Sequence, residues 1–492
     1  MQKNALTDGR IIHIITYIDD KDIKNGFLSV EVKSSLEVKT QQTIRAELLN
    51  YIEENQMLVY HFAEISGINS GTLSRFINGS QLIPIKALDR MTYTMGLEEG
   101  TFYDLYVDEL LLDPSTDWRR LRPFLTRCSQ LNKLFCIEKV VDLMLEKSYY
   151  ISSLFDFAES LYEGGNTTAS LLIYKKVSEG ERYQHAERLA VCQYRIFKLS
   201  LGNDQHINYE LALVFEPFVT RLGELEQLDA IKDLVNLYVS LQKWEKAKQL
   251  STEMGRIARI QYDLKHKRKV NEISVSGPKK VLFGYILYSH LILGTVAEEA
   301  RDFNEAFYHL EKYEDHSWIV ETDAAAEQTK KQFLVWATAN RMLYRIMTGD
   351  IQLIENYVDS LASNDNEILL ALFKVVKAAL KYSCNIDHIL ERYNEMIQNQ
   401  VISQKKVGTY TSQVINDRFV IFLADLAEYY IRSLRPNIGI IFVLDSLAIS
   451  AKLNNDAYLV RCFCLFEKLR HSATVDQLDK YKAILKEVEL VI

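Results

Sequence analysis

The sequence contains few residues that interrupt a regular chain. Its 492 residues include only 6 prolines and 19 glycines, and leucine, isoleucine, alanine, glutamate and lysine are abundant. Because proline and glycine most often end helices and form tight turns, this composition predicts an all-α protein. A chain of this length exceeds what one compact core usually accommodates, so we expect two or more domains.

Features of membrane, secreted and metal-binding proteins are also missing. No apolar run reaches the length of a membrane span, and the first residues, MQKNALTDGR, lack the basic-then-apolar order of a signal peptide. We therefore expect a cytoplasmic protein with no membrane partner. The six cysteines are scattered without a CxxC motif or a neighbouring histidine, which predicts buried thiols and no metal site.

Catalytic motifs are absent as well. The chain has no GxxxxGK[ST] phosphate loop, no GxGxxG, no HExxH and no GxSxG, and its ten histidines are dispersed. We therefore expect neither enzymatic activity nor a cofactor. A basic run around His266 lies in a predicted surface loop, residues 265–280, which we interpret as solvated, with a nucleic-acid contact as the alternative.

The segment from Val59 to Gly79, VYHFAEISGINSGTLSRFING, has the spacing of a helix-turn-helix. Ala63 falls where two helices must approach closely, and Gly67 falls where the turn needs a positive backbone angle. Leu73 then anchors the second helix in a core. Asn69 or Ser70 can cap that second helix, and Gly79 can end it.

The predicted DNA-facing surface of this segment is nearly neutral. Residues 41–108 contain four basic and nine acidic residues, a sum of -5 that argues against strong non-specific DNA binding, yet only Glu64 is acidic between Val59 and Ile85. Arg75 can recognise guanine through its two-donor fork, or it pairs with Glu64 instead. Weak charge on each domain favours a dimer on a two-fold operator in double-stranded DNA. The residues predicted to contact DNA are Asn69, Ser70, Gly71, Thr72, Ser74 and Arg75.

The rest of the chain divides around this segment. Residues 1–40 form an N-terminal extension in which IIHIITYI and GFLSVEV suggest a small β-hairpin. Residues 41–112 have the apolar periodicity of five short helices, the plan of a Cro or phage-repressor domain, and Pro114 marks a boundary. Residues 117–492 have the pattern of successive helix pairs.

A partial motif recurs where the second helix of a pair would begin. It occurs as NTTA at 166–169, WEKA at 244–247, FNEA at 303–306 and IQLI at 351–354. The separations of 78, 59 and 48 residues differ from the period of about 34 typical of tetratricopeptide repeats. We favour a tetratricopeptide-like α-solenoid of degenerate repeats, and an irregular helical domain is the alternative.

Together, the AEISGINSGTLSRFINGS segment and the long helical array resemble the RRNPP receptors, the cytosolic quorum-sensing regulators of Gram-positive bacteria and their phages, with an arbitrium-receptor-like architecture. The resemblance is specific in the first domain and architectural in the second. It implies a homodimeric transcription regulator whose repeat domain binds a short signalling peptide and thereby alters DNA binding. The leading 40 residues and the irregular repeat spacing depart from the family pattern.

The resemblance also implies which residues contact the peptide. Asparagine offers one donor and one acceptor to an extended backbone, while aromatic and arginine side chains bind side chains and the terminal carboxylate. For each asparagine, a surface or capping role is the alternative. A second hypothesis is a DNA-binding regulator or scaffold whose helical domain binds a protein partner. The candidate peptide-binding residues are Asn236, Tyr238, Tyr288, Trp336, Asn340, Arg341, Tyr344, Asn416 and Arg418, with Tyr285 beside Tyr288.

Overall fold

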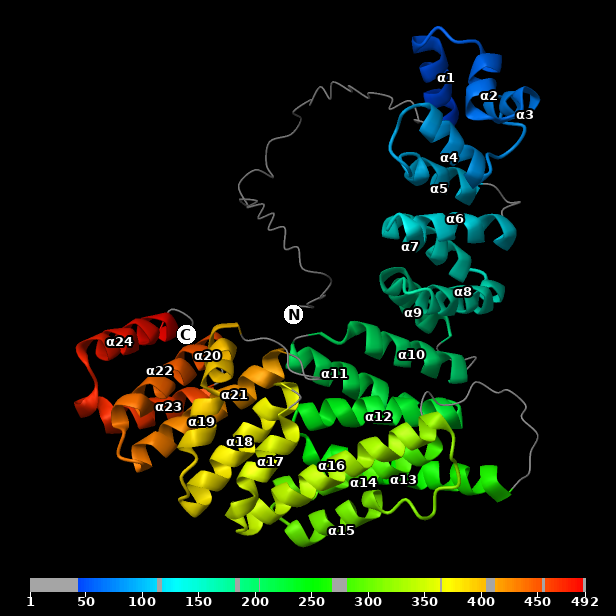
Figure 1. Ribbon diagram of the computed structural model, residues 1–492. Coiled ribbons are helices and arrows are strands. Elements are labelled where there is room, and N and C mark those ends of the chain that lie inside the picture. The colour runs from blue at the N-terminus through cyan, green and yellow to red at the C-terminus, as the bar shows by residue number, and fades with distance from the viewer. Residues whose placement is uncertain are drawn as a thin grey trace, which may run out of the picture. The chain divides into compact units, whose positions relative to one another are not determined.

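The computed structural model describes residues 43–112, 117–181, 186–202, 204–267, 281–362, 365–403, 412–453 and 456–489, and every regular element in these ranges is a helix (Figure 1). The all-α prediction is therefore confirmed for this part of the chain, and the hairpin expected within residues 1–40 lies outside it. The chain divides into two compact units, Met1–Tyr106 and Val107–Ile492. This division falls a few residues before the predicted domain end at Leu112.

The first unit is built from short helices around a small apolar core. Ile44, Phe62, Leu73 and Leu88 are almost completely buried in it. The Tyr106 hydroxyl donates a hydrogen bond of 2.6 Å to the Ile83 carbonyl oxygen, which fixes the last helix against the chain before α4. The helices of this part of the chain are α1 Ile44–Glu54, α2 Val59–Ser66, α3 Ser70–Ile77, α4 Ile85–Thr94 and α5 Tyr103–Leu112.

The α2–α3 pair has the local geometry that its sequence predicts. Gly67 ends α2 in the left-handed region at φ 65°, where a side chain would be strained. The Asn69 side chain caps α3 by accepting hydrogen bonds from the backbone nitrogens of Gly71 (3.1 Å) and Thr72 (3.3 Å). Ala63 and Leu73 are buried between the helices.

The second unit is a succession of antiparallel helix pairs (Figure 1). Short 3-10 helices occur at Ser148–Tyr150, Glu216–Arg221, Ile351–Leu353 and Arg470–Ser472. Its helices before residue 300 are α6 Trp118–Gln130, α7 Leu134–Leu145, α8 Ile151–Glu163, α9 Thr167–Gly180, α10 Ala186–Ser200, α11 Gln205–Phe215, α12 Glu224–Ser240, α13 Trp244–Lys267 and α14 Leu282–Glu299. The later ones are α15 Phe303–Glu314, α16 Ala324–Thr348, α17 Ile354–Leu361, α18 Asp365–Tyr382, α19 Asp387–Arg392, α20 Asn394–Ser403, α21 Ser412–Arg432, α22 Pro436–Leu453, α23 Asp456–Leu469 and α24 Val475–Glu489.

The turns inside these pairs explain the recurring sequence motif. Each motif residue expected to open a second helix is buried against the first helix of its pair, at Ala169, Ala247, Ala306 and Ile354. The preceding turn contains a residue with a positive φ angle in each case, namely Gly165, Gln242, Arg301 and Gly349. A left-handed residue reverses the chain tightly, so pairs of different length share one connection.

One predicted boundary is wrong. The loop expected from Lys265 begins later, because α13 continues as a helix to Lys267. The carboxylate of Glu321 lies 3.1 Å from the His266 ring nitrogen and 3.7 Å from Lys265, so His266 is paired with a carboxylate rather than simply solvated. Residues 268–280 lie outside the described residues.

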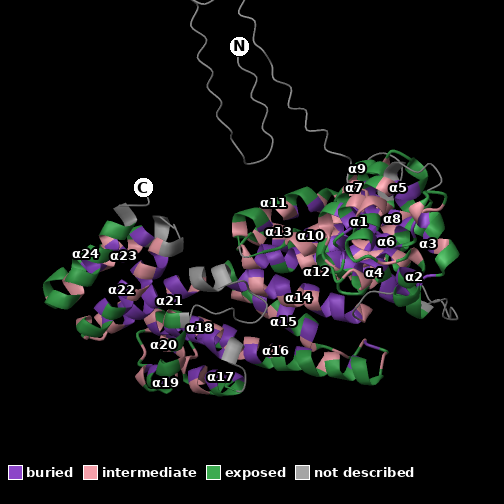
Figure 2. Ribbon diagram, turned by 90° about the horizontal axis from the view of Figure 1, so that it is seen from above, coloured by how far each residue is buried: buried purple, intermediate pink, exposed green. Residues whose placement is uncertain are grey.

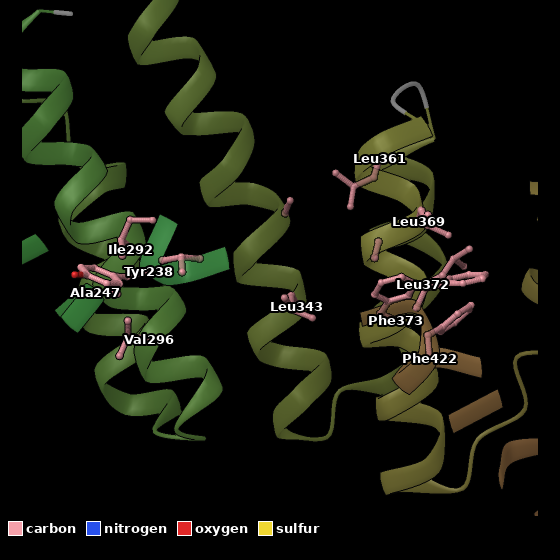
Figure 3. Packing of buried hydrophobic residues seen from close by; sticks show 14 of the residues in the cluster. Tyr238, Ala247, Ile292, Val296, Leu343, Leu361, Leu369, Leu372, Phe373 and Phe422 are labelled. Carbon is pink, nitrogen blue, oxygen red and sulfur yellow. The ribbon is translucent and has the colours of Figure 1, made fainter. Parts of the chain in front are cut away.

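A continuous hydrophobic core runs through the described helices from α10 to α24. Figure 2 shows buried residues along most of these helices, with exposed residues on their outer sides. Figure 3 shows part of this core, including Phe373 of α18 and Phe422 of α21, whose ring centroids are 4.6 Å apart. Among the helices that the structure describes, none has both the length and the apolar character needed to cross a membrane.

Candidate functional sites

The first candidate site is the outer surface of α3. Leu73 and Phe76 are buried on one side of this helix, whereas Ser70, Ser74 and Arg75 are exposed on the other. Gly71 is also exposed and Thr72 is half-buried. The surface therefore presents small hydroxyl groups, a glycine backbone and one guanidinium group, which are groups that can donate to phosphates and base edges.

Arg75 folds back along its own helix. Its Nε donates to the Gly71 carbonyl oxygen (3.3 Å), and one terminal nitrogen donates to the Thr72 hydroxyl oxygen (3.1 Å). No carboxylate in the described residues forms an ion pair with Arg75, so the alternative pairing with Glu64 is not observed there. The guanidinium is held in place while donors on its other nitrogen remain exposed.

The second candidate site lies between the first helices of successive pairs in the second unit. Asn236 is exposed on α12, and its side-chain oxygen accepts a hydrogen bond from the Tyr288 hydroxyl of α14. Two of the predicted peptide-binding residues, 52 positions apart in the sequence, are therefore in contact. A backbone N–H or C=O group of an extended peptide can take the place of either partner in this hydrogen bond.

Residues of α16 form a neighbouring polar group. Asn340 donates a hydrogen bond of 3.0 Å to the Tyr313 hydroxyl of α15, and Arg341 pairs with Glu314. Trp336 is half-buried, and its ring packs edge-on against Phe333 with centroids 5.1 Å apart. These three predicted residues are thus partly accessible, and two of them are held by contacts with α15.

Two predicted peptide-binding residues are core residues instead. Tyr238 is completely buried, lies in the hydrophobic cluster of Figure 3 and donates through its hydroxyl to Glu216. Tyr344 is 1% exposed and packs edge-on against Phe307. Because successive helical residues turn by about 100°, Tyr238 faces away from Asn236, two positions earlier. Tyr285 is also buried, and its hydroxyl donates to Asp229 (2.6 Å).

The last two candidates lie on α21. Asn416 is within this helix, but its side chain is outside the described residues. Arg418 lies near Glu299 at the end of α14. Burial alone would raise the pKa of the Glu299 carboxyl, but Lys374, Lys377 and Arg418 outweigh it and hold that pKa below its ordinary value.

A set of polar contacts between neighbouring first helices was not expected from the sequence. Asp233 of α12 accepts a hydrogen bond of 2.8 Å from Tyr194 of α10 and lies 3.0 Å from Lys198. Arg195 of α10 donates to Glu159 of α8 at 2.9 and 3.0 Å. No local motif encodes such contacts, because each joins residues 35 or more positions apart. Within the part of the chain that the structure describes, no three potential ligands are grouped in a way that could hold a metal ion.

Comparisons with known proteins give no family. No family model matches the chain, and no curated protein matches it. Among solved structures, a similar one is described as "Circular tandem repeat protein with novel repeat topology and enhanced subunit contact surfaces". It is 11% identical, the alignment covers 90% of this chain and 98% of that chain, and the TM-score is 0.20. At this score the likeness carries no argument about fold or function.

Proposed function

We propose that the protein is a sequence-specific DNA-binding transcription regulator whose helical array, a set of degenerate tetratricopeptide-like repeats, binds a short signalling peptide that alters DNA binding. The observation that carries the proposal is the α2–α3 pair. A left-handed Gly67 and an Asn69 cap orient α3 so that Ser70, Ser74 and Arg75 point to solvent. This is the arrangement that a recognition helix needs in a major groove.

The charge of the first unit favours specific over non-specific DNA binding. A helix surface with a single guanidinium group neutralises few phosphates, so we expect the affinity to come from base contacts and from two copies on one operator. We therefore propose that the functional form is a homodimer.

The proposed peptide site is the surface around Asn236, Tyr288, Trp336, Asn340 and Arg341. Its support is the exposed Asn236–Tyr288 hydrogen bond between two helix pairs. A peptide backbone that replaces this bond would exchange one neutral hydrogen bond for others, at little net cost. It would thereby change the spacing of α12 and α14.

The DNA proposal is tested by fluorescence anisotropy with the DNA that flanks the gene. We expect saturable, sequence-dependent binding that weakens by about tenfold or more in Arg75→Ala, since a bidentate base contact is worth about 1–3 kcal/mol. Lys86→Ala is the matched control, because it removes one exposed positive charge from α4 and leaves α3 intact. Equal losses in both variants would indicate charge attraction alone and contradict specific recognition.

The peptide proposal is tested on the same complex with synthetic peptides from the neighbouring open reading frame. We expect one peptide to shift the DNA-binding curve of the wild-type protein and to lose that effect in Asn236→Ala. Asn437→Ala, an exposed asparagine on α22, serves as the control. If no peptide shifts the curve while DNA binding is specific, the helical array has another partner.

A protein partner is the second candidate, and exposed apolar side chains in the first unit favour it. Leu58, Tyr60 and Ile65 around α2 and Tyr93 of α4 are more than half exposed. Such residues on a small acidic domain can form a contact with another protein. Specific DNA binding that depends on Arg75 would exclude a scaffold that no longer binds DNA.

A further inference from the structure

A cavity of about 380 Å³ lies between α13, α14 and α15, in the middle of the second unit. Its floor is α14, which packs against both neighbouring helices. Gly255 of α13 permits this close packing, because a Cβ atom there would lie 2.5 Å from the Ser289 hydroxyl oxygen. A volume of this size is within the range of small-molecule sites.

The cavity is positively charged although the protein is acidic overall. Lys248, Arg256 and Arg259 line it together with a single carboxylate, Glu305, whereas the whole chain has a net charge of -8. Two of these cations are already paired. Arg256 donates to Glu253 at 2.6 and 2.8 Å, and Lys248 lies 3.4 Å from Glu305.

Arg259 differs from the other two cations. No carboxylate in the described residues pairs with it, and its guanidinium carbon lies 4.1 Å from the centroid of the Trp318 ring. Stacking on an aromatic ring fixes the plane of a guanidinium group and leaves its N–H groups available. Arg259 is therefore a positioned donor fork at the cavity.

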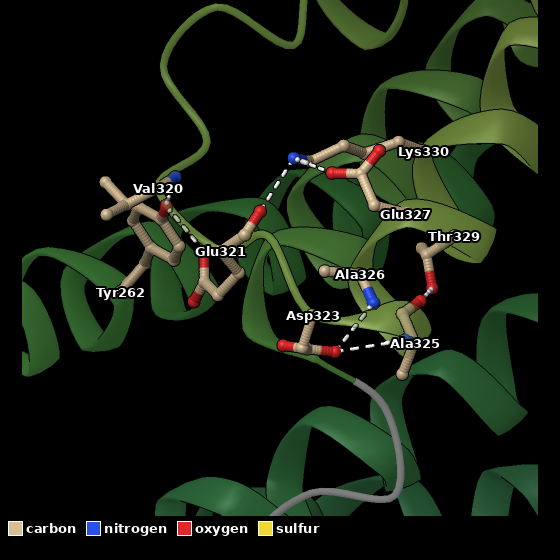
Figure 4. Close-up of polar contacts among 9 residues, drawn as sticks. All are labelled: Tyr262, Val320, Glu321, Asp323, Ala325, Ala326, Glu327, Thr329 and Lys330. Atoms are coloured by element: carbon tan, nitrogen blue, oxygen red, sulfur yellow. Dashed lines mark hydrogen bonds and ion pairs between the residues drawn. The ribbon is translucent and has the colours of Figure 1, made fainter.

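The segment that carries Trp318 is itself anchored to α13. The Tyr262 hydroxyl accepts a hydrogen bond from the Val320 backbone nitrogen and donates to Glu321, both at 2.9 Å (Figure 4). The Tyr262 ring also packs edge-on against Trp318 at 5.2 Å. Lys330 then donates to the Glu321 carbonyl oxygen at 2.7 Å (Figure 4). These contacts hold Trp318, and through it Arg259, in a defined place.

Two histidines complete the lining. The Nδ1 atoms of His290 on α14 and His309 on α15 are 3.0 Å apart, so the protonated Nδ1 of one ring donates a hydrogen bond to the unprotonated Nδ1 of the other. Burial, together with His309, Arg259 and Lys312, lowers the pKa of His290 to about 4. The charged and titratable groups facing the pair are Lys248 and Arg259 of α13, Glu305, Tyr308 and Lys312 of α15, and Tyr344 of α16.

We propose that this cavity binds a small molecule through a phosphate or carboxylate group, with Arg259 as the principal donor and the His290–His309 pair beside the bound anion. An oxyanion would pair with the one guanidinium that has no carboxylate partner in the described residues. It would also lower the positive potential at the two rings, so that binding takes up a proton.

The cavity is separate from the proposed peptide site. His290 follows Tyr288 by two residues, which places the two side chains about 200° apart around α14. None of the residues that support DNA or peptide binding lines the cavity. The inference therefore succeeds or fails independently of the proposed function.

The test is isothermal titration of the full-length protein with inorganic phosphate and, separately, with succinate, at constant ionic strength and at pH 6. We expect saturable binding of at least one probe, and the tighter one identifies the anionic group. Affinity should fall by about tenfold or more in Arg259→Gln, because a charge-assisted hydrogen bond is lost. Arg470→Gln should bind like the wild-type protein, since this cation is also paired with a carboxylate, Glu467, but lies outside the cavity lining.

A second variant separates binding from folding. His290→Gln can still hydrogen-bond to His309 but leaves one ring in place of two, so it should reduce the proton uptake. The uptake is measured as the difference in binding heat between two buffers of unequal ionisation enthalpy, and the wild-type protein with the same probe corrects for protons that the probe itself exchanges. Circular dichroism confirms that each variant is folded. Absence of saturable binding to both probes, equal loss in Arg470→Gln and Arg259→Gln, or unchanged proton uptake in His290→Gln would each overturn the proposal.

Discussion

Lys374 provides a strong test of how the second unit is held together. Its ammonium group, on α18, donates to both carboxylate oxygens of Glu298 (2.7 and 2.9 Å) and to Glu299 (2.7 Å) at the end of α14. The Glu298 side chain is only 7% exposed, and that of Lys374 is 23% exposed. Removing the cation would leave the nearly buried Glu298 carboxylate beside that of Glu299, which is 31% exposed, with no cation between them.

We therefore expect Lys374→Met to lower the free energy of unfolding by about 3–5 kcal/mol, the usual cost of breaking one side of a buried ion pair. The control is Lys482→Met. Lys482 lies 3.1 Å from Asp479, and the two side chains are 67% and 64% exposed, so the expected cost is about 0–1 kcal/mol. Both substitutions remove one positive charge from the second unit, but only Lys374 leaves a nearly buried carboxylate without its partner.

Urea unfolding followed by tryptophan fluorescence measures this difference. All four tryptophans, Trp118, Trp244, Trp318 and Trp336, belong to the second unit, so the signal does not report on the first. Comparable losses for the two variants would refute the argument from burial. The Lys374→Met deficit should also shrink as the pH is lowered, because Lys374 helps to hold the pKa of Glu299 down, and without it this carboxylate is protonated more readily and loses its charge.

Two further predictions concern the turn before α3 and the histidine pair. Gly67→Ala should destabilise the first unit by about 1–2 kcal/mol, because nothing blocks a Cβ atom there and only the left-handed backbone is strained, and Gly67→Asn should cost less. Amide hydrogen exchange in α2 and α3 measures both, and equal protection in all three proteins would disprove the strain. Burial lowers the pKa of His290 to about 4, so on acidification the unfolded chain binds a proton at this histidine before the folded protein does. The free energy of unfolding is therefore highest above about pH 6.5 and falls toward pH 4. His290→Gln should make this fall smaller when unfolding is followed by tryptophan fluorescence. His206→Gln, which changes an exposed histidine, should leave it unchanged, and identical pH curves for all three proteins would contradict the prediction.

Residues that act within one or two helical turns could be predicted from sequence. Gly67 and Asn69 have the conformation and capping bonds that their spacing indicates, because both roles depend on nearby backbone. The buried Ala169, Ala247 and Ala306 were equally predictable, since only a small residue fits where a second helix starts against a first. The turns that contain Gln242 and Arg301 were expected as well, but the left-handed conformation of these two residues was not, because residue types other than glycine and asparagine seldom adopt it.

The candidate peptide site was predictable only in part. Asn236 and Tyr288 were expected on the same or neighbouring helices, but the hydrogen bond between them was not predicted. The burial of Tyr238 follows from helical geometry, which places positions two apart on different faces. The cavity at Arg259 and His290 had one sequence signal. Gly255 inside a long helix costs about 1 kcal/mol relative to alanine, and such a residue indicates close packing of another helix. Which side chains gather beside it depends on helices that the sequence does not place.

Polar contacts between distant helices have a consequence for how the second unit responds to a ligand. In a regular repeat protein, each repeat contacts only its neighbours, and stability is nearly a sum of local terms. Here Lys374 joins α18 directly to α14 across the intervening α16–α17 pair. A ligand that shifts α14, whether at Tyr288 on one side or at His290 on the other, would therefore change the position of the two carboxylates that hold Lys374. Helix pairs joined in this way should respond to a ligand together, because α14 carries both candidate contacts and the ion pair with Lys374.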